Sequence, residues 1–138
     1  MLGDAEKAVA EFHRVAEFEL PSTPTLLSRE RVELRAKWIR EEIEELLAAQ
    51  DLAQQADAAA DIVYFAIGIF VELGISASDI FSLVHKSNME KLKHREKFRR
   101  DIDGKVLKPS DWQSPDAQIR EYIANSAKAP SVPPCSDP

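Results

Sequence analysis

Two aspartates stand near the start of an otherwise almost entirely apolar stretch, DAAADIVYFAIGIFVELG, at residues 57 to 74. Asp57 and Asp61 are four residues apart, so on a helix they lie one turn apart on the same side. Burying an unpaired carboxylate is costly, so each must be paired with a basic group, protonated or bound to a cation.

A second group of acids lies in the run EEIEE. At about 100° per residue on a helix, Glu42 and Glu45 project to the flank of Leu34 and Trp38, with Glu41 at the edge. A flank that carries a tryptophan is not plain solvent surface, so these acids are predicted to point into a partly covered cleft. The competing explanation is an ordinary acidic helix surface.

Carboxylates spaced three and four residues apart on two facing helices converge into an oxygen-lined pocket, which suits Mg²⁺ or Mn²⁺. The sequence has no cluster of Cys or His that would favour zinc, and no Glu-x-x-His pair that would favour a di-iron bundle. A divalent metal held by acids of both segments is therefore one hypothesis. Neutralisation of the acids by lysine or arginine is the other.

The segments that follow carry groups suited to phosphate. Asn88 and Lys91 continue the apolar stripe of the expected fourth helix. A lysine in that place, beside a carboxylate–metal site, makes a good phosphate clamp, and a counter-ion to the paired aspartates is the alternative role. Lys105 and Lys108 lie in the turn-forming segment DGKVLKP, which suggests a basic loop closing on a polyphosphate.

Helical periodicity between few chain breakers predicts an all-α domain. Only four glycines occur, and Gly74 stands where helix C-termini favour glycine. Ser76 or Ser78 is expected to cap the fourth helix, and Ser114 to cap a short final helix with Pro115 in its first turn. The expected helices span about residues 4–18, 29–50, 52–73, 76 or 78 to 99, and 115–125.

Apolar stripes predict which helix faces are buried. The stripe of the first helix places Phe12 in the core, whereas His13 is expected at the surface or a cleft edge, as a candidate ligand contact rather than a catalyst. Helix 52–73 is apolar on nearly every side, which predicts a fully buried helix that a second subunit helps to cover. The two stripes comprise Ala5, Val9, Phe12 and Ala16, and then Val32, Ala36, Ile39, Ile43 and Leu46.

Bulk composition limits the class of protein. The 138 residues, 44% hydrophobic and 30% charged, suit one globular domain over residues 1–125 with a disordered Pro/Ser-rich tail over 126–138. The net charge of -6 argues against a nucleic-acid partner, although a bound metal would still permit phosphate binding. The N-terminal segment lacks signal-peptide features, and no apolar run is long enough to span a membrane. With Cys135 as the single cysteine, we expect a cytoplasmic protein.

Five motifs then resemble, in order and spacing, the all-α nucleoside triphosphate pyrophosphohydrolases. They are EFHR, REEIEELLAA, DAAADIVYFAIG, VHKSNMEKL and DGKVLKPSDWQSPD. This group includes the MazG-like proteins, the dimeric all-α dUTPases and phosphoribosyl-ATP pyrophosphohydrolase. The resemblance covers about residues 9 to 116 and is strongest to the small MazG-like, phosphoribosyl-ATP-pyrophosphohydrolase-like branch.

The family pattern is E-E-x-x-E on one helix and E-x-x-D on the next. Asp61 matches the final aspartate, Ala58 stands where the family has glutamate, and Asp57 resembles its replacement in a D-x-x-x-D form. The first element is intact as Glu41, Glu42 and Glu45.

The resemblance also implies roles for these residues. Glu41 would be a second-metal ligand or the base that orients water, and Tyr64 would lie near the sugar or the metal shell. Mg²⁺, with Mn²⁺ as a substitute, would be held by Glu42, Glu45, Asp57 and Asp61. The catalytic candidates are then Glu41, Glu42, Glu45 and Asp61. The implied phosphate contacts are Asn88, Lys91, Lys105 and Lys108.

The implied fold is a four-helix MazG-like bundle assembled as a homodimer or a dimer of dimers. The implied reaction is Mg²⁺-dependent hydrolysis of a (d)NTP to (d)NMP and pyrophosphate, in house-cleaning of nucleotides such as dUTP or dCTP. One alternative is a phosphoribosyl-ATP-pyrophosphohydrolase-like activity. Another is a non-catalytic helical regulatory or interaction protein, which Ala58 keeps open.

Overall fold

The computed structural model describes residues 1–93 and 98–127. This described part is all helical and contains no strand, only an isolated antiparallel bridge between Arg100 and Val106. The all-α prediction is therefore confirmed. The helices are α1 Leu2–Val15, α2 Arg29–Ala48, α3 Leu52–Leu73, α4 Ala77–Glu90 and α5 Asp116–Ser126. The expected tail lies almost wholly outside the described residues, and so does Cys135.

Side-chain caps set the ends of the two long helices and the start of α4. Ser28 and Asp51 each accept a hydrogen bond from the backbone N–H three residues on, and Ser76 does the same at α4. Gly74 ends α3 with φ 65, and a Cβ there would lie 2.9 Å from both Pro21 Cγ and the Thr23 carbonyl oxygen. Only glycine fits this left-handed position against the 21–23 segment.

Two predicted helix ends are wrong. The helix expected over 4–18 ends at Val15, because Glu17 adopts φ 59 and the Phe18 N–H bonds back to the His13 carbonyl. The helix expected to reach residue 99 ends at Glu90, and residues 91–93 form a turn. Of the rest of the expected helix, residues 94–97 lie outside the described part of the chain, and residues 98 and 99 are not helical.

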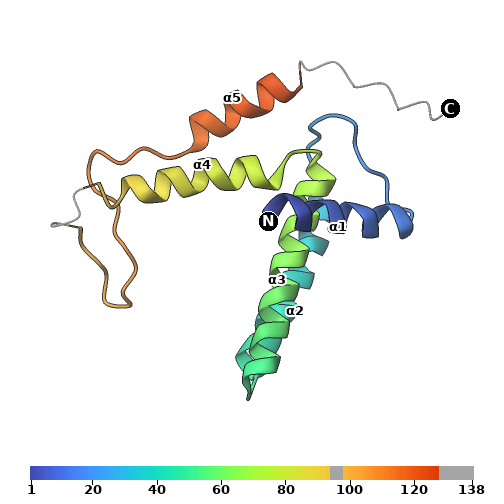
Figure 1. Cartoon of the computed structure of the whole chain (residues 1–138), viewed down its shortest axis with the longest axis horizontal. Helices are drawn as coiled ribbons and strands as arrows, with labels where there is room; N and C mark the ends of the chain where they lie inside the picture. Colours follow the sequence, from blue (N-terminus) through green and yellow to red (C-terminus); the bar gives the residue numbers. More distant parts are fainter. Residues whose placement is uncertain (94–97, 128–138) are drawn as a thin grey trace.

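The helices form two arms that meet near the N-terminus (Figure 1). Helices α2 and α3 pack antiparallel as one arm, a hairpin whose tip is the 49–51 connection. The chain bends by 113° between α3 and α4, so α4 leaves the hairpin and forms the second arm, with α5 along it. Helix α1 contacts both α3 and α4 where the arms meet. Within one chain, α4 thus crosses the hairpin axis instead of lying along it.

The buried apolar core of the described chain is small. Its members are Val9, Ala58, Ile67, Ala77 and Ile80. No single helix of the described residues is apolar and long enough to cross a membrane, although the bent pair α3–α4 passes the same criteria of length and composition.

Helix α3 is only partly buried in a single chain, because one hairpin partner cannot cover every side of a helix, and its expected cover by a second subunit stays a prediction. Val63 is 53% exposed, and the buried α3 residues are Ala58, Ile67, Gly68 and Glu72. The α2 stripe expected in the core is likewise half exposed: Val32 is 47% and Ile43 41% exposed.

The first helix is rotated relative to the prediction. Phe12 is 53% exposed, and His13, expected at the surface, is buried at 2% exposure. Val9 and His13, one turn apart, form the inward side of α1. The expected assignment fails because His13 has polar partners inside the fold that make its burial favourable.

Candidate active site

The predicted carboxylates gather on the α2–α3 arm. Glu42 on α2 is half-buried, and Glu45, Asp57 and Asp61 are exposed. Glu45 from α2 and Asp57 from α3 line one shallow cavity of about 340 Å³ toward the hairpin tip, together with Gln54. Two helix segments that are separated by a tight connection thus present their acids to the same space.

The negative charges of the neighbouring acids act together on Glu42. Burial raises the pKa of its carboxyl group, and the charges of neighbouring acids raise it further. These neighbours, in order of effect, are Glu45, Asp61, Glu41 and Asp57. The predicted set of acids therefore shares one electrostatic environment, centred on Glu42.

The Glu42 Oε2 atom is buried and has no hydrogen-bond partner among the described residues. An acid oxygen surrounded by other acids is satisfied by a cation and not by another acceptor. The chemistry of this donor set, all carboxylate oxygens, fits a hard divalent ion. Among the described residues no three His, Cys, Asp or Glu side chains converge closely enough to hold a metal, so the arrangement brings the acids together without fixing a coordination geometry.

The competing explanation, neutralisation by basic side chains, receives no support within the described chain. No described ion pair there involves Glu42, Glu45, Asp57 or Asp61. Glu41, at the edge of the group, faces Lys37 at 3.7 Å across one exposed helix turn. An exposed pair of this kind contributes little energy and leaves Glu41 free to exchange partners.

Aromatic side chains border the acids. Trp38, one turn before Glu42 on α2, is half-buried and packs on Phe65 with ring centroids 5.8 Å apart. This confirms that the flank of Glu42 is not plain solvent surface. Tyr64, one turn after Asp61 on α3, is 36% exposed. Its ring meets Phe12 edge-on at 5.9 Å.

Three of the four predicted phosphate contacts, Asn88, Lys91 and Lys108, gather elsewhere, at the far end of α4. Lys91 Nζ donates to Asn88 Oδ1 at 2.6 Å and lies 5.1 Å from the centre of the Trp112 ring. Lys108 Nζ lies 4.5 Å from the centre of the same ring, so one indole contacts both ammonium groups. Lys105 is exposed, and its backbone N–H donates to Asp101 in a turn. Lys91 is thus not the counter-ion of the paired aspartates in this chain.

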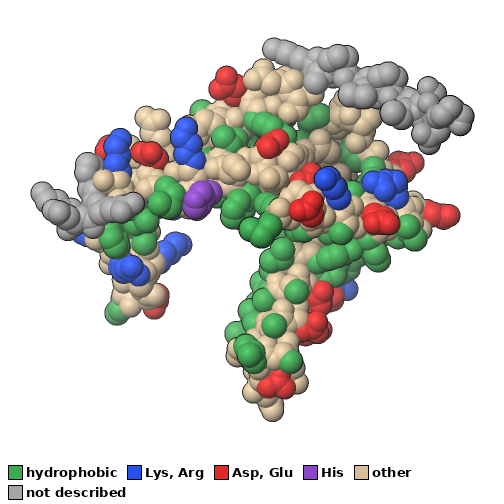
Figure 2. Space-filling view, in the orientation of Figure 1, with side chains coloured by type: hydrophobic (Ala, Val, Ile, Leu, Met, Phe, Trp, Pro, Cys, Tyr) green, Lys and Arg blue, Asp and Glu red, His purple; other side chains and the backbone are tan. Residues whose placement is uncertain are grey.

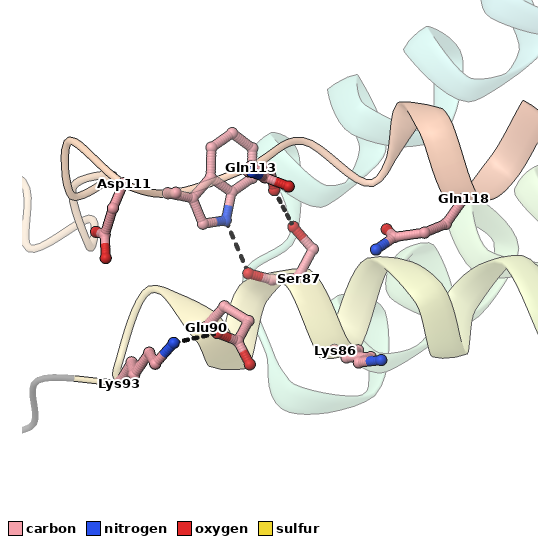
Figure 3. A pocket seen from close by; sticks show the side chains of 8 residues that line it. Lys86, Ser87, Glu90, Lys93, Asp111, Gln113 and Gln118 are labelled. Carbon is pink, nitrogen blue, oxygen red and sulfur yellow. Dashed lines mark hydrogen bonds and ion pairs between the residues drawn. The ribbon is translucent and has the colours of Figure 1, made fainter.

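Trp112 holds this basic segment against α4. Its indole N–H donates to the Ser87 carbonyl at 2.8 Å, and Ser87 Oγ donates to the Gln113 carbonyl at 3.2 Å (Figure 3). Ser87 is buried. We call Lys91, Lys108 and Trp112 the cationic cluster. Trp112 is not among the predicted site residues, although it follows the basic loop closely in the sequence.

A further group missed from the sequence is buried at the base of the hairpin. Glu72 accepts hydrogen bonds from both Arg31 and Arg35. Burial alone would raise the pKa of Glu72, but the hydrogen bonds and charges of the two arginines outweigh it and lower the pKa to about 2. Arg35 reaches this position because Gly68 leaves room: a Cβ there would lie 2.9 Å from Arg35 Nη1.

His13 belongs to this buried group. Its Nδ1 lies 2.8 Å from the Val9 carbonyl oxygen, which can only accept, so Nδ1 carries the proton. Its Nε2 then accepts from Arg35 at 2.6 Å. His13 therefore orients Arg35, and its predicted contact with a ligand stays a prediction. The sequence carries one indication of this buried charged group: Glu72 is the single charged residue between Ile62 and Leu73.

Comparison with known proteins gives one family. The sequence model of phosphoribosyl-ATP pyrophosphohydrolase matches residues 9–88, more than half of the chain. The matched range contains every predicted carboxylate and ends before the cationic cluster. A search of curated proteins finds no match. Enzymes of the family split a phosphoric anhydride bond and commonly use divalent metals. The chain belongs to the phosphoribosyl-ATP pyrophosphohydrolase family, within the all-α, MazG-like NTP pyrophosphohydrolase superfamily, and is a hydrolase acting on phosphoric anhydride bonds.

Proposed function

We propose that this protein is a Mg²⁺-dependent pyrophosphohydrolase that converts a nucleoside triphosphate and water to the monophosphate and pyrophosphate. The observation that carries the proposal is the Glu42 carboxylate, whose buried oxygen has no hydrogen-bond partner in the described chain and is surrounded by acids. Family membership supplies the reaction class, and the carboxylates supply the chemistry that this class needs.

The proposed roles follow from where the side chains lie. Mg²⁺, or Mn²⁺ in its place, would be held by Glu42, Glu45, Asp57 and Asp61. When bound, such an ion offsets phosphate charge and lowers the pKa of a coordinated water. Glu41 lies at the exposed edge of these acids, where a carboxylate is placed to accept a proton from the attacking water. Lys91, Lys105 and Lys108, with Asn88, bind the phosphates of the leaving pyrophosphate.

The substrate is either a common (d)NTP or phosphoribosyl-ATP. Both carry the same triphosphate chain, so the same acids serve either reaction. The match to the phosphoribosyl-ATP pyrophosphohydrolase model supports phosphoribosyl-ATP at least as strongly as a common (d)NTP. Removal of excess or non-standard nucleotides such as dUTP and dCTP is the proposed role if the substrate is a free nucleotide.

One experiment tests the function and chooses between the substrates. The purified full chain is incubated with MgCl₂ and each common NTP, each dNTP or phosphoribosyl-ATP, and all products are identified by ion-exchange chromatography. We expect pyrophosphate and the corresponding monophosphate from at least one substrate, and none when EDTA replaces MgCl₂. Orthophosphate with a diphosphate, or no turnover of any substrate, would refute the proposal.

We also propose that the protein is a homodimer or a dimer of dimers in the cytoplasm. Support for the assembly comes from the apolar stripe of α2 that one chain leaves uncovered. This surface forms a cavity of about 320 Å³ with a predominantly apolar lining. Its lining includes Leu27, Val32, Ile39 and Ile69. Apolar surface of this kind is stabilised by a second copy.

A further inference from the structure

The contacts between α2 and α3 follow one antiparallel register that starts at the hairpin base. Arg31 donates to Glu72, and one turn nearer the tip Arg35 fills the space that Gly68 leaves. The two contacts are four residues apart on each helix, counted upward along α2 and downward along α3. The hairpin base is thus a layer of paired charges in which one arginine occupies a slot on the facing helix, and such an interlock fixes how two helices are aligned.

An aromatic contact is the next step of this register. Trp38 of α2 packs on Phe65 of α3 with ring centroids 5.8 Å apart, three residues nearer the tip on each helix than the Arg35 contact. One further turn toward the tip, the same register places Glu42 opposite Asp61. The aromatic pair therefore lies between the charged layer at the base and the first pair of candidate metal ligands.

The buried charged layer also holds the Trp38 ring. The Cζ atoms of Arg31 and Arg35 lie 5.4 and 5.1 Å from the centre of the indole. Arg35 is itself fixed, because it donates to the Glu72 carboxylate and to His13 Nε2. The indole is half-buried, although it lies only one turn from the acids of α2. The position of Trp38 therefore depends on the charged layer through two cation–π contacts, and on α3 through the contact between the rings.

The acids need support of this kind because they repel one another. Like charges on facing helices push the helices apart until a cation offsets them. Figure 2 shows acidic side chains gathered along one flank of the hairpin arm, and Glu45, Asp57 and Asp61 are exposed. Toward the tip, α3 buries Ala58, which offers only a methyl group to the facing helix. Beside the acids, the aromatic pair is therefore the contact that is placed to hold α2 against α3.

We propose that Trp38 is a positioning residue for the metal site: packed on Phe65, it sets the separation of α2 and α3 at the acids, and so the geometry in which Glu42 and Asp61 share a cation. This inference rests on the proposed function, because the cation is the one that the proposed reaction needs. It adds that Arg35, buried at the base of the hairpin, acts on the site through Trp38 without touching metal or substrate.

Affinity for Mn²⁺, measured by electron paramagnetic resonance, tests the proposal. Trp38→Leu and Phe65→Leu each remove one ring of the pair and keep an apolar side chain, and each should raise the Mn²⁺ dissociation constant at least about tenfold. Trp38→Phe keeps a ring and should stay within about threefold of wild type. The double leucine variant should bind Mn²⁺ no more weakly than either single variant, because the two rings act as one contact. Additive losses would overturn the proposal, and so would wild-type affinity in both single leucine variants.

Phe18→Leu is the matched control for a loss of stability alone. The Phe18 ring lies 5.4 Å from Arg31 Cζ and 5.2 Å from the His13 ring, but it belongs to the connection between α1 and α2 and not to the α2–α3 contact. It should lower the melting temperature and leave the Mn²⁺ dissociation constant within about twofold of wild type. Equal losses of affinity in Phe18→Leu and Trp38→Leu would overturn the proposal. If Trp38→Leu does not fold, Phe65→Leu decides the question from the facing helix.

A spectroscopic readout separates this inference from the proposed function. Bound Mn²⁺ broadens nearby proton resonances steeply with distance, and the indole N–H resonance of Trp38 is identified by its absence from Trp38→Phe. We expect this resonance to broaden as the site fills with Mn²⁺, and Asp61→Asn to abolish the effect. Broadening together with weakened binding in Trp38→Leu, without turnover of any nucleotide, would uphold the positioning role and refute the function. Turnover by the wild type without broadening at Trp38 would uphold the function and refute the positioning role.

Discussion

At the scale of single residues, two buried side-chain nitrogen or oxygen atoms of the described chain lack a hydrogen-bond partner, Arg35 Nε and Glu42 Oε2. Their surroundings differ. Arg35 is balanced by Glu72, and three contacts fix its guanidinium: Glu72, His13 and the Trp38 ring. Glu42 has acids around it and a raised pKa. The missing hydrogen bond at Arg35 Nε is therefore a feature of the packing, whereas the missing hydrogen bond at Glu42 Oε2 is consistent with cation binding.

The first prediction concerns the acids themselves. Glu45→Gln and Asp61→Asn each remove a charge from an exposed position, so the fold should remain and turnover should fall by at least about 100-fold. The measurement is kcat/KM beside a thermal melt. Glu44→Gln, an exposed acid on the same helix outside the candidate set, is the control and should stay within about twofold of wild type. Near-normal rates in both site variants would refute the assigned roles.

The second prediction concerns Glu72. Its carboxyl pKa is about 2 in the folded chain against 4.5 as the reference value, so the unfolded chain binds more protons between these values and the free energy of unfolding rises with pH there. The contribution is complete above about pH 4.5 and is lost as pH falls toward about 2. Glu72→Gln should cost about 3 kcal/mol at pH 7, because it leaves two arginines without their counter-charge.

Urea unfolding at a series of pH values measures this effect. The stability difference between wild type and Glu72→Gln should be largest at neutral pH and shrink below about pH 4.5. A difference that stays constant down to pH 3 would show that the ion pair is not its source.

At the scale of elements, helix positions were predictable and the contacts between them were not. Gly74, Ser28 and Asp51 act locally, through φ angles and hydrogen bonds within one turn, and the expected bounds of α2 and α3 lie within two residues of their observed ends. The burial of Arg35 depends on Gly68 and Glu72 of another helix, which no local pattern reveals. The grouping of the acids was predictable, because three- and four-residue spacings on adjacent helices are local too.

The third prediction concerns the segment that carries the lysines. Trp112→Phe keeps an aromatic ring beside Lys91 and Lys108 but removes the donor to the Ser87 carbonyl. The loss of one hydrogen bond should cost about 1 kcal/mol, and the loosened basic segment should raise KM several-fold with a smaller change in kcat.

Tyr122→Phe is the matched control for Trp112. It removes one hydrogen bond between α5 and Asp79 of α4, on the same arm but with no contact to the lysines. It should lower stability by a similar amount and leave KM unchanged. Equal kinetic effects from the two variants would mean that Trp112 stabilises the arm without positioning the lysines.

At the scale of the whole molecule, the sequence predicted more core than one chain has. The α2 stripe and most of α3 have the apolar character of buried surface, yet several of their large side chains are exposed in the single chain. A stripe that looks like core and lies outside is typical of a subunit interface. Sequence periodicity reports that a face is buried, not which chain buries it, and this explains why α3 was expected to be fully covered.

The fourth prediction tests this surface. Val32→Lys places a charge on the exposed apolar stripe of α2, one turn from the hairpin base and away from the acids. It should shift the molar mass measured by light scattering from that of a dimer or tetramer toward that of a monomer. Glu33→Gln, on the neighbouring exposed side of α2, should leave the mass unchanged. A wild-type protein that is monomeric at micromolar concentration would contradict the expected assembly.

The central claim is that these acids bind a divalent cation, and titration of Mn²⁺ followed by electron paramagnetic resonance tests it most directly. Mn²⁺ is added to the full chain with a non-hydrolysable triphosphate analogue, and the signal of unbound Mn²⁺ is compared with analogue alone and with the Glu42→Gln and Asp61→Asn variants. We expect the wild type to remove the signal well below the concentration at which either variant does. Equal binding by wild type and variants, or no binding beyond that of the analogue, would contradict the claim.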